Sequence, residues 1–139
     1  RATVILLDTH AWIWHLANPS SLSESARAAI DTGYRSYRTG NGGTVAISAI
    51  SIWELFTLVK KGRLDLNVPP ASFITNTRRD SVMRIVPVDE DIARRSVELP
   101  DIHQDPADRL ILATAVEMGW PVISRDTQFP GYDAATVIW

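Results

Sequence analysis

Cysteine is absent from this chain of 139 residues. Disulfide bonds, thiolate metal sites and cysteine nucleophiles are therefore all excluded. A chain without cysteine is compatible with the cytoplasm, where disulfides are rare, and the cytoplasm is the location that we expect.

Long hydrophobic runs are also missing. The longest, such as residues 3–7, fall far short of the roughly 20 apolar residues that a membrane helix needs. That first run ends at Asp8, which makes it too short and too early for a signal peptide. We therefore expect no association with a membrane.

The chain has no excess of positive charge, because its formal net charge is −2. Twelve of the 14 basic residues are arginine, which suits planar contacts to phosphate or carboxylate. They gather at 35–38, 60–63, 78–84 and 94–95. Solvated helix faces explain at least half of these clusters, while a basic rim around an acidic cleft would explain the others.

Short apolar runs alternate with amphipathic segments along the chain. The runs predict strands at 2–7, 44–47, 83–86, 121–123 and 136–139. Helical periodicity and capping residues predict helices at 11–16, 26–30, 49–61, 72–79, 89–99 and 107–118, the second of them capped by a box at 21–24. Residues 33–43 are the least regular. The pattern predicts an α/β fold with a central, mostly parallel sheet flanked by helices, in a single domain over residues 1–139.

Four acids fall where such a sheet would bind a ligand, which is beyond the carboxyl ends of its strands. Asp8 directly follows the first strand, and Asp126 follows the strand at 121–123. Asp108 opens the most apolar helix, and Glu54 interrupts a segment that is otherwise almost free of charge. An acid in an apolar segment needs a partner, because burying a lone carboxylate is costly.

Four carboxylates at one edge of a sheet would repel one another, and either protons or a divalent cation would relieve the repulsion. Ligands that are all oxygen favour Mg²⁺ or Mn²⁺ over zinc. Such an ion orients a water, lowers its pKa and neutralises charge on a phosphodiester in the transition state. The cluster therefore indicates phosphodiester hydrolysis.

Each acid also has a plainer explanation. Asp8 can cap the following helix, Asp108 can stabilise a helix dipole, and Asp126 can form an Asx turn. Glu54 can pair with a nearby lysine or arginine. One shared site explains four such placements better than four coincidences do.

Other residues carry weaker signals. Asp105, three residues before Asp108, is either an acid that supports the site or a loop cap. The histidines lack metal-ligand spacing, although His10 or His103 could border the cleft, and three tryptophans could stack on bases, although core positions are more common. These residues are His10, His15 and His103, and Trp12, Trp14 and Trp53.

Taken together, the motifs at 4–9, 47–55, 103–115 and 122–126 resemble the four motifs of PIN domains, in the same order and spacing. Asp8, Glu54, Asp108 and Asp126 stand at the acidic positions of those motifs. The Asp-Thr-His-Ala-Trp opening at 8–12, the stretch 103–109 and the terminal Ile-Trp are similar to the VapC-like branch in particular. The resemblance covers nearly the whole chain.

The resemblance implies a Rossmann-like PIN fold and a ribonuclease that depends on Mg²⁺ or Mn²⁺. It implies that Asp8, Asp108 and Asp126 are metal ligands and that Glu54 is the fourth catalytic acid. Thr9, Asp105 and Ser124 would support them. It further implies cleavage of RNA, often tRNA, as the toxin of a type II toxin–antitoxin pair, with homodimerisation and inhibition by a VapB-like antitoxin whose basic segment enters the acidic cleft.

The resulting hypothesis is that Asp8 and Asp108 hold a metal ion and that Asp126 helps directly or through water. Glu54 would orient the attacking water or a second ion, and the products would carry 5′-phosphate and 3′-hydroxyl ends. Asp108 is preferred to Asp105 as the ligand because it aligns with the helix-opening acid of the family. The alternative is a non-catalytic PIN scaffold that binds RNA or protein; an aspartyl phosphatase is disfavoured because His10 stands where that class needs a second Asp.

Overall fold

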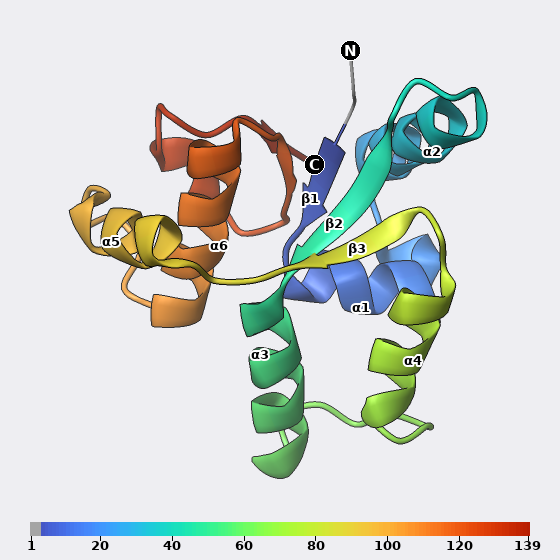
Figure 1. Ribbon diagram of the computed structural model, residues 1–139. Coiled ribbons are helices and arrows are strands. Elements are labelled where there is room, and N and C mark those ends of the chain that lie inside the picture. Colours follow the sequence, from blue (N-terminus) through green and yellow to red (C-terminus); the bar gives the residue numbers. More distant parts are fainter. Residues whose placement is uncertain (1–3) are drawn as a thin grey trace.

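The computed structural model describes residues 4–139, in which a twisted central sheet is covered by helices on both faces (Figure 1). The five strands lie in the order β3-β2-β1-β4-β5, and all four neighbouring pairs are parallel. Their bounds are β1 Val4–Leu7, β2 Thr44–Ser48, β3 Met83–Val86, β4 Val122–Ile123 and β5 Val137–Ile138. The predicted α/β fold with a parallel sheet is confirmed.

Six α-helices connect or follow the strands, as parallel strands require crossover connections. They are α1 Thr9–Ala17, α2 Glu24–Arg38, α3 Ala49–Lys60, α4 Ala71–Arg79, α5 Glu90–Glu98 and α6 Pro106–Met118. Two short 3₁₀ turns lie at Pro19–Ser21 and Phe129–Gly131. None of the helices within residues 4–139 is both long enough and apolar enough to cross a bilayer.

Two hydrophobic cores lie on opposite faces of the sheet, because successive strand residues point to opposite sides. Ile5 and Leu7 of β1 enter the core beneath α1, α2 and α4, whereas Leu6 enters the core beneath α5 and α6. β2 repeats the alternation, with Val45 on the first side and Ala46 on the second. Burial on both faces explains why these strands are continuous apolar runs.

Several expected boundaries were wrong or fall outside the described residues. Residues 2 and 3 of the first predicted strand lie outside them. The segment 33–38 is helical rather than irregular, because Gly33 allows α2 to pack closely on β2 and its Cβ position would lie 3.3 Å from the Thr44 carbonyl oxygen. The cap of α2 is Ser23, which accepts from the Ala26 amide, and not the box starting at Ser21.

The loop between α2 and β2 contains a close approach that only glycine permits. A Cβ built on Gly43 would lie 2.4 Å from the Cβ of Ser36 and 2.6 Å from the carbonyl oxygen of Gly33. Both of those atoms belong to α2, so the clash cannot be relieved by rotating one flexible side chain.

We expect Gly43→Ala to lower the free energy of unfolding by about 1–3 kcal/mol, the usual cost of overpacking. Asn41→Ala, at an exposed position in the same loop, should change it by less than about 0.5 kcal/mol. Chemical denaturation of both variants measures the difference. Equal midpoints for the two variants would contradict the close approach.

Candidate metal centre

Parallel pairing of β1 with β4 brings two of the predicted acids to one edge of the sheet. Leu7 is paired with Ile123, and the backbone amide of Asp8 donates to the carbonyl of Ile123 at 3.0 Å. Asp8 and the segment that leads to Asp126 therefore leave the sheet side by side.

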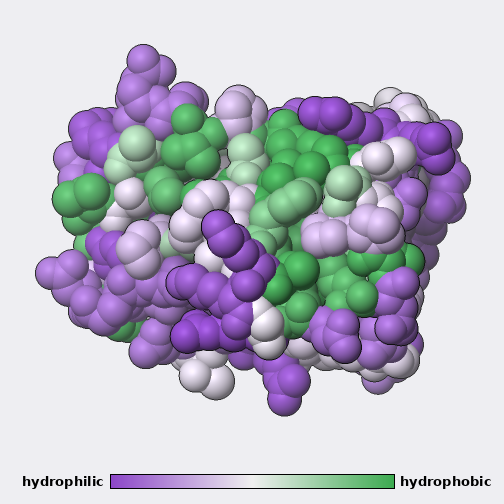
Figure 2. Space-filling view, turned by 90° about the horizontal axis from the view of Figure 1, so that it is seen from below, coloured by the Kyte–Doolittle hydropathy of each residue, from purple (hydrophilic) through white to green (hydrophobic). Residues whose placement is uncertain are grey.

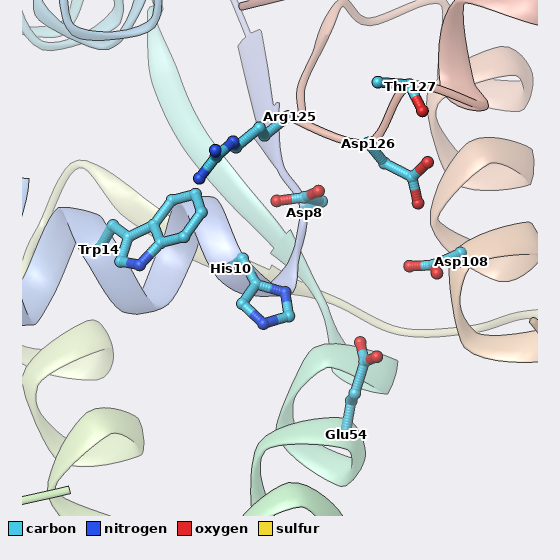
Figure 3. Close-up of a pocket in the computed structure, with 8 residues that line it drawn as sticks. All are labelled: Asp8, His10, Trp14, Glu54, Asp108, Arg125, Asp126 and Thr127. Carbon is cyan, nitrogen blue, oxygen red and sulfur yellow. The ribbon is translucent and has the colours of Figure 1, made fainter. Parts of the chain in front are cut away.

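Asp8 is buried and performs two tasks. Its Oδ1 atom accepts from the backbone amide of Ala11 at 2.8 Å, which makes it the N-cap of α1. The hydroxyl of Ser124 also hydrogen-bonds to its carboxylate. The capping explanation is thus correct, but the carboxylate also borders the cleft that the other acids share (Figure 3).

Glu54 reaches the same cleft from the second turn of α3. The buried hydroxyl of Thr9 donates to Oε1 of Glu54 and lies 2.9 Å from the hydroxyl of Ser51. Since Thr9 has only one hydroxyl proton, Ser51 must be the donor in the second bond. Among residues 4–139 no lysine or arginine pairs with Glu54, so neutral hydroxyls hold it rather than a cation.

The two acids near the start of α6 have different positions. α6 begins at Pro106, and its N-cap is Asp105, whose Oδ1 accepts from the amides of Ala107 and Asp108 at 2.9 and 3.2 Å. Asp105 is exposed, whereas Asp108 is half-buried in the first turn and lines the cleft. Asp105 still lies close enough to Glu54 and Asp108 for one ligand atom of each to fall within 4.8 Å of the others.

Asp126 follows β4 in a tight turn. Its Oδ1 accepts from the amide of Gln128 at 2.8 Å, so the expected Asx turn is present. Its own amide donates to the hydroxyl of Ser124 at 3.0 Å. Ser124 therefore contacts both Asp8 and Asp126 and links the acids that follow β1 and β4.

His103 belongs to the cluster although its spacing in the sequence gave no indication of this. Its Nε2 lies 2.7 Å from Oδ2 of Asp126 and 3.2 Å from Oδ2 of Asp108. Its Nδ1 accepts from the amide of Asp105 at 3.1 Å, so in the neutral ring the proton is on Nε2. His103 is then a donor to two acids. Metal-ligand spacing does not indicate a residue of this kind, although the position of His103 just before the cap of α6 was a usable signal.

Arg109 and Tyr132 fix the loop that carries His103. The guanidinium donates to the carbonyl oxygens of Leu99, Pro100 and His103 at 2.8, 3.0 and 3.0 Å. The hydroxyl of Tyr132 accepts from the amide of His103 at 2.6 Å. Because these bonds hold the backbone on both sides of the loop, the imidazole has little freedom to move away from the acids.

Electrostatic repulsion marks the centre of the cluster. Burial raises the pKa of Asp108 to about 8, and the negative charges of Glu54, Asp105 and Asp126 add to the rise. Burial is also the main cause that raises the pKa of Asp8 to about 6. These carboxyl groups favour the protonated form when no cation is present. A hard divalent cation would favour the ionised form instead, and carboxylate oxygens are the ligands that it prefers.

The four acids line a cleft of about 510 Å³. Asp8, Glu54, Asp108 and Asp126 come from different segments and converge on it (Figure 3). The other lining residues are His10, Trp14, Arg125 and Thr127. A cleft with clustered carboxylates on one side and a cation on another can accept a divalent ion together with an anionic substrate.

The sequence profile of the PIN domain matches residues 5–135, and the chain belongs to the PIN-domain family. It is also 35% identical, over 125 residues, to Ribonuclease VapC22 of Mycobacterium tuberculosis, which covers 89% of this chain and 88% of that protein. This similarity places it among the VapC ribonucleases.

Solved structures share the fold. A chain of FitAcB from Neisseria gonorrhoeae superposes with a TM-score of 0.61 and 26% identity, covering 96% of this chain and 95% of that one. A chain in the crystal structure of VapBC2 from Rickettsia felis bound to a promoter DNA fragment gives a TM-score of 0.67 with 16% identity, covering 97% of both chains. At that identity the second likeness concerns the fold alone.

The raised carboxyl pKa values predict an unusual pH dependence of stability. In the folded, metal-free protein Asp8 holds its proton between about pH 4 and 6 and Asp108 between about pH 4 and 8, where the unfolded chain has lost them. Stability in EDTA should therefore fall as the pH rises, by on the order of 1–2 kcal/mol between pH 6 and 8, or a few degrees in Tm.

Asp108→Asn should flatten this dependence, whereas Asp65→Asn, at an exposed position between α3 and α4, should leave it unchanged. Thermal melts of the three proteins in EDTA across this pH range provide the measurement. A wild-type Tm that rises from pH 6 to pH 8 would contradict the repulsion described above.

His103 should act as a positioning residue for Asp108 and Asp126. His103→Leu removes the Nε2 donor and should raise the divalent-metal concentration for half-maximal activity by about 10–100-fold, the usual effect of losing a partner of a metal ligand. His103→Gln keeps an N–H donor and should recover part of the loss. If both variants fold by circular dichroism and show unchanged metal dependence, His103 has only a structural role.

Proposed function

We propose that the chain is a Mg²⁺- or Mn²⁺-dependent endoribonuclease, the toxin of a VapBC-type pair, acting as a single PIN domain over residues 1–139. The observation that carries the proposal is the convergence of Asp8, Glu54, Asp108 and Asp126 on one cleft. A non-catalytic scaffold would have no need to keep four mutually repelling acids together.

In this proposal Asp8, Asp108 and Asp126 hold the ion. Ser124 would orient Asp8 and Asp126 through its side chain, and Asp105 would fix the first turn of α6 below Asp108. A bound divalent ion supplies positive charge that stabilises the phosphorane-like transition state and lowers the pKa of a nearby water.

Glu54 is proposed to orient the attacking water. Thr9 occupies Oε1, which leaves the second carboxylate oxygen available to accept a hydrogen bond from water. The water oxygen forms a bond to phosphorus, Glu54 takes the released proton, and the bond from phosphorus to the 3′ oxygen breaks. The 3′ oxygen takes a proton from solvent, so the products carry a 5′-phosphate and a 3′-hydroxyl.

RNA is the proposed substrate, and tRNA is the first RNA to test. The chain is similar, at 18% identity, to a toxin whose crystal structure is described as sarcin–ricin loop cleaving, VapC20 of Mycobacterium tuberculosis. That identity shows the fold alone, so the choice of RNA rests on the family and the acid cluster. We further propose that the protein acts in the cytoplasm.

A protein partner is proposed from the apolar surface near α3 and α4. The face seen in Figure 2 has hydrophobic surface gathered between hydrophilic areas. Ile52, Trp53, Phe56 and Ile74 line a groove there, and Trp53 is 59% exposed. Exposed apolar patches of this kind mark interaction sites. We propose that this apolar surface is covered by two interactions, binding of a VapB-like antitoxin and homodimerisation. A basic segment of the same antitoxin would enter the acidic cleft.

Activity on RNA should require both the ion and the acids. We expect cleavage of single-stranded RNA and tRNA with Mg²⁺ or Mn²⁺, no cleavage in EDTA, and a loss on the order of a hundredfold or more in Asp8→Asn and Glu54→Gln. Sequencing of the product ends checks the predicted chemistry, and Asp65→Asn is the matched control. Cleavage that persists in EDTA or in Asp8→Asn would refute the mechanism.

Metal binding distinguishes the proposed enzyme from the scaffold alternative without an activity assay. Calorimetric titration with Mn²⁺ should give saturable binding to the wild type and weaker binding to Asp8→Asn. A wild type that binds RNA but no Mn²⁺ would favour the scaffold.

A further inference from the structure

Of Trp12, Trp14 and Trp53, the residue that lines the acid cleft is Trp14. Trp12 is fully buried, and its indole N–H donates to the hydroxyl of Thr77 at 2.9 Å. Trp53 lies in the groove with Phe56. Trp14 is half-buried and lines the same cleft as Asp8, which places an aromatic surface beside the proposed centre (Figure 3).

Three neighbouring rings, each tilted by 49° to the next, form what we call the aromatic wall: His10 and Trp14, which line the cleft, and Trp139, which packs against Trp14. The ring centroids of His10 and Trp14 are 5.6 Å apart, and those of Trp14 and Trp139 are 5.8 Å apart. His10 and Trp14 share a face of α1 because they are four residues apart. Since α1 starts directly after Asp8, the wall begins at the acid cluster.

Arg125 extends toward this wall and away from the acids. It precedes Asp126, but in Figure 3 the two side chains point in different directions, Asp126 toward α6 and Arg125 toward the side of the cleft that Trp14 lines. Among residues 4–139 no carboxylate lies within 4.0 Å of it. Arg125 is exposed, so its guanidinium is available to an anion that enters the cleft.

We infer that the aromatic wall and Arg125 form a nucleotide subsite for single-stranded RNA, an inference that rests on the proposed function. A base next to the cleaved bond stacks on Trp14, and the phosphate beside it contacts Arg125. Aromatic rings that accept successive bases, together with a cation that follows the backbone, are the usual parts of such sites. The subsite holds the substrate beside acids that by themselves repel it.

The charge of Arg125 decides between RNA and the basic segment of an antitoxin as the occupant of this wall. A guanidinium without an acidic partner attracts a phosphate and repels a basic peptide. The acidic side of the cleft would suit the peptide instead. A peptide that uses the aromatic wall is therefore an outcome that would contradict the inference.

Removing one base at a time from the substrate tests the subsite. The substrate is a single-stranded oligonucleotide that the wild type cleaves at one bond. Replacing one of the nucleotides beside that bond by an abasic residue should lower kcat/KM of the wild type on the order of tenfold. Trp14→Leu should lower kcat/KM on the intact oligonucleotide by a similar factor and should be insensitive to the same abasic residue. Trp14→Phe should restore most of the effect.

Two control variants are matched to these changes. Trp120 is another half-buried tryptophan, two residues before β4 at the end of that strand opposite to the acids, and Trp120→Leu should keep the full response to the abasic residue. Arg125→Ala should raise KM and make it less dependent on salt, whereas Arg94→Ala, on the exposed face of α5, should not.

The outcomes separate this inference from the proposed function. If the wild type cleaves RNA with metal but Trp14→Leu responds to the abasic residue as the wild type does, the subsite is overturned and the nuclease stands. If no RNA is cleaved, fluorescence anisotropy of the labelled oligonucleotide with Mn²⁺ still tests the subsite. Equal affinities of the wild type and Trp14→Leu for the oligonucleotide would overturn it. So would a Trp14→Leu variant that loses affinity for a basic peptide but not for the oligonucleotide.

Discussion

Repulsion between carboxylates at one edge of the sheet is the constraint around which the rest of the site is arranged. The parallel pairing of β1 with β4 forces Asp8 close to the segment carrying Asp126, and α6 brings Asp108 against both. Burial is the largest cause that raises the pKa of Asp108, and the negative charges of the neighbouring acids raise it further. The fold tolerates this cost only where a function requires it, which is typical of active sites.

Hydroxyl groups and an imidazole, rather than lysine or arginine, hold the acids in place. The hydroxyl of Thr9 donates to Glu54, the hydroxyl of Ser124 hydrogen-bonds to Asp8 and accepts from the backbone amide of Asp126, and Nε2 of His103 contacts Asp108 and Asp126. A lysine or arginine in these positions would neutralise the cluster and compete with a metal ion. Hydroxyl and imidazole donors orient the oxygens and leave the negative charge available to the ion.

The fold and the acids were predictable because both depend on local patterns. Buried parallel strands are continuous apolar runs, and an acid directly after such a run lies at a known edge of the sheet. The extent of α2 was not predictable, since Gly33 appears as a helix breaker until its close contact with β2 is seen. The sequence places His103 among the residues that could border the cleft, but does not predict its contact with Asp126, because that acid follows β4 and only the fold brings its Oδ2 to 2.7 Å from Nε2.

The same constraint explains why the cleft needs a second, different wall. A polyanion that approaches four carboxylates meets repulsion until a divalent ion is present, and the ion alone fixes only one phosphate. Orientation of the chain on either side must come from contacts that do not depend on the acids. The rings beginning at His10 and the guanidinium of Arg125 lie where such contacts are needed, because α1 and the turn after β4 leave the sheet from the same two strand ends that present Asp8 and Asp126. One pairing of strands therefore places both the four carboxylates and the surface proposed to hold the substrate against their charge.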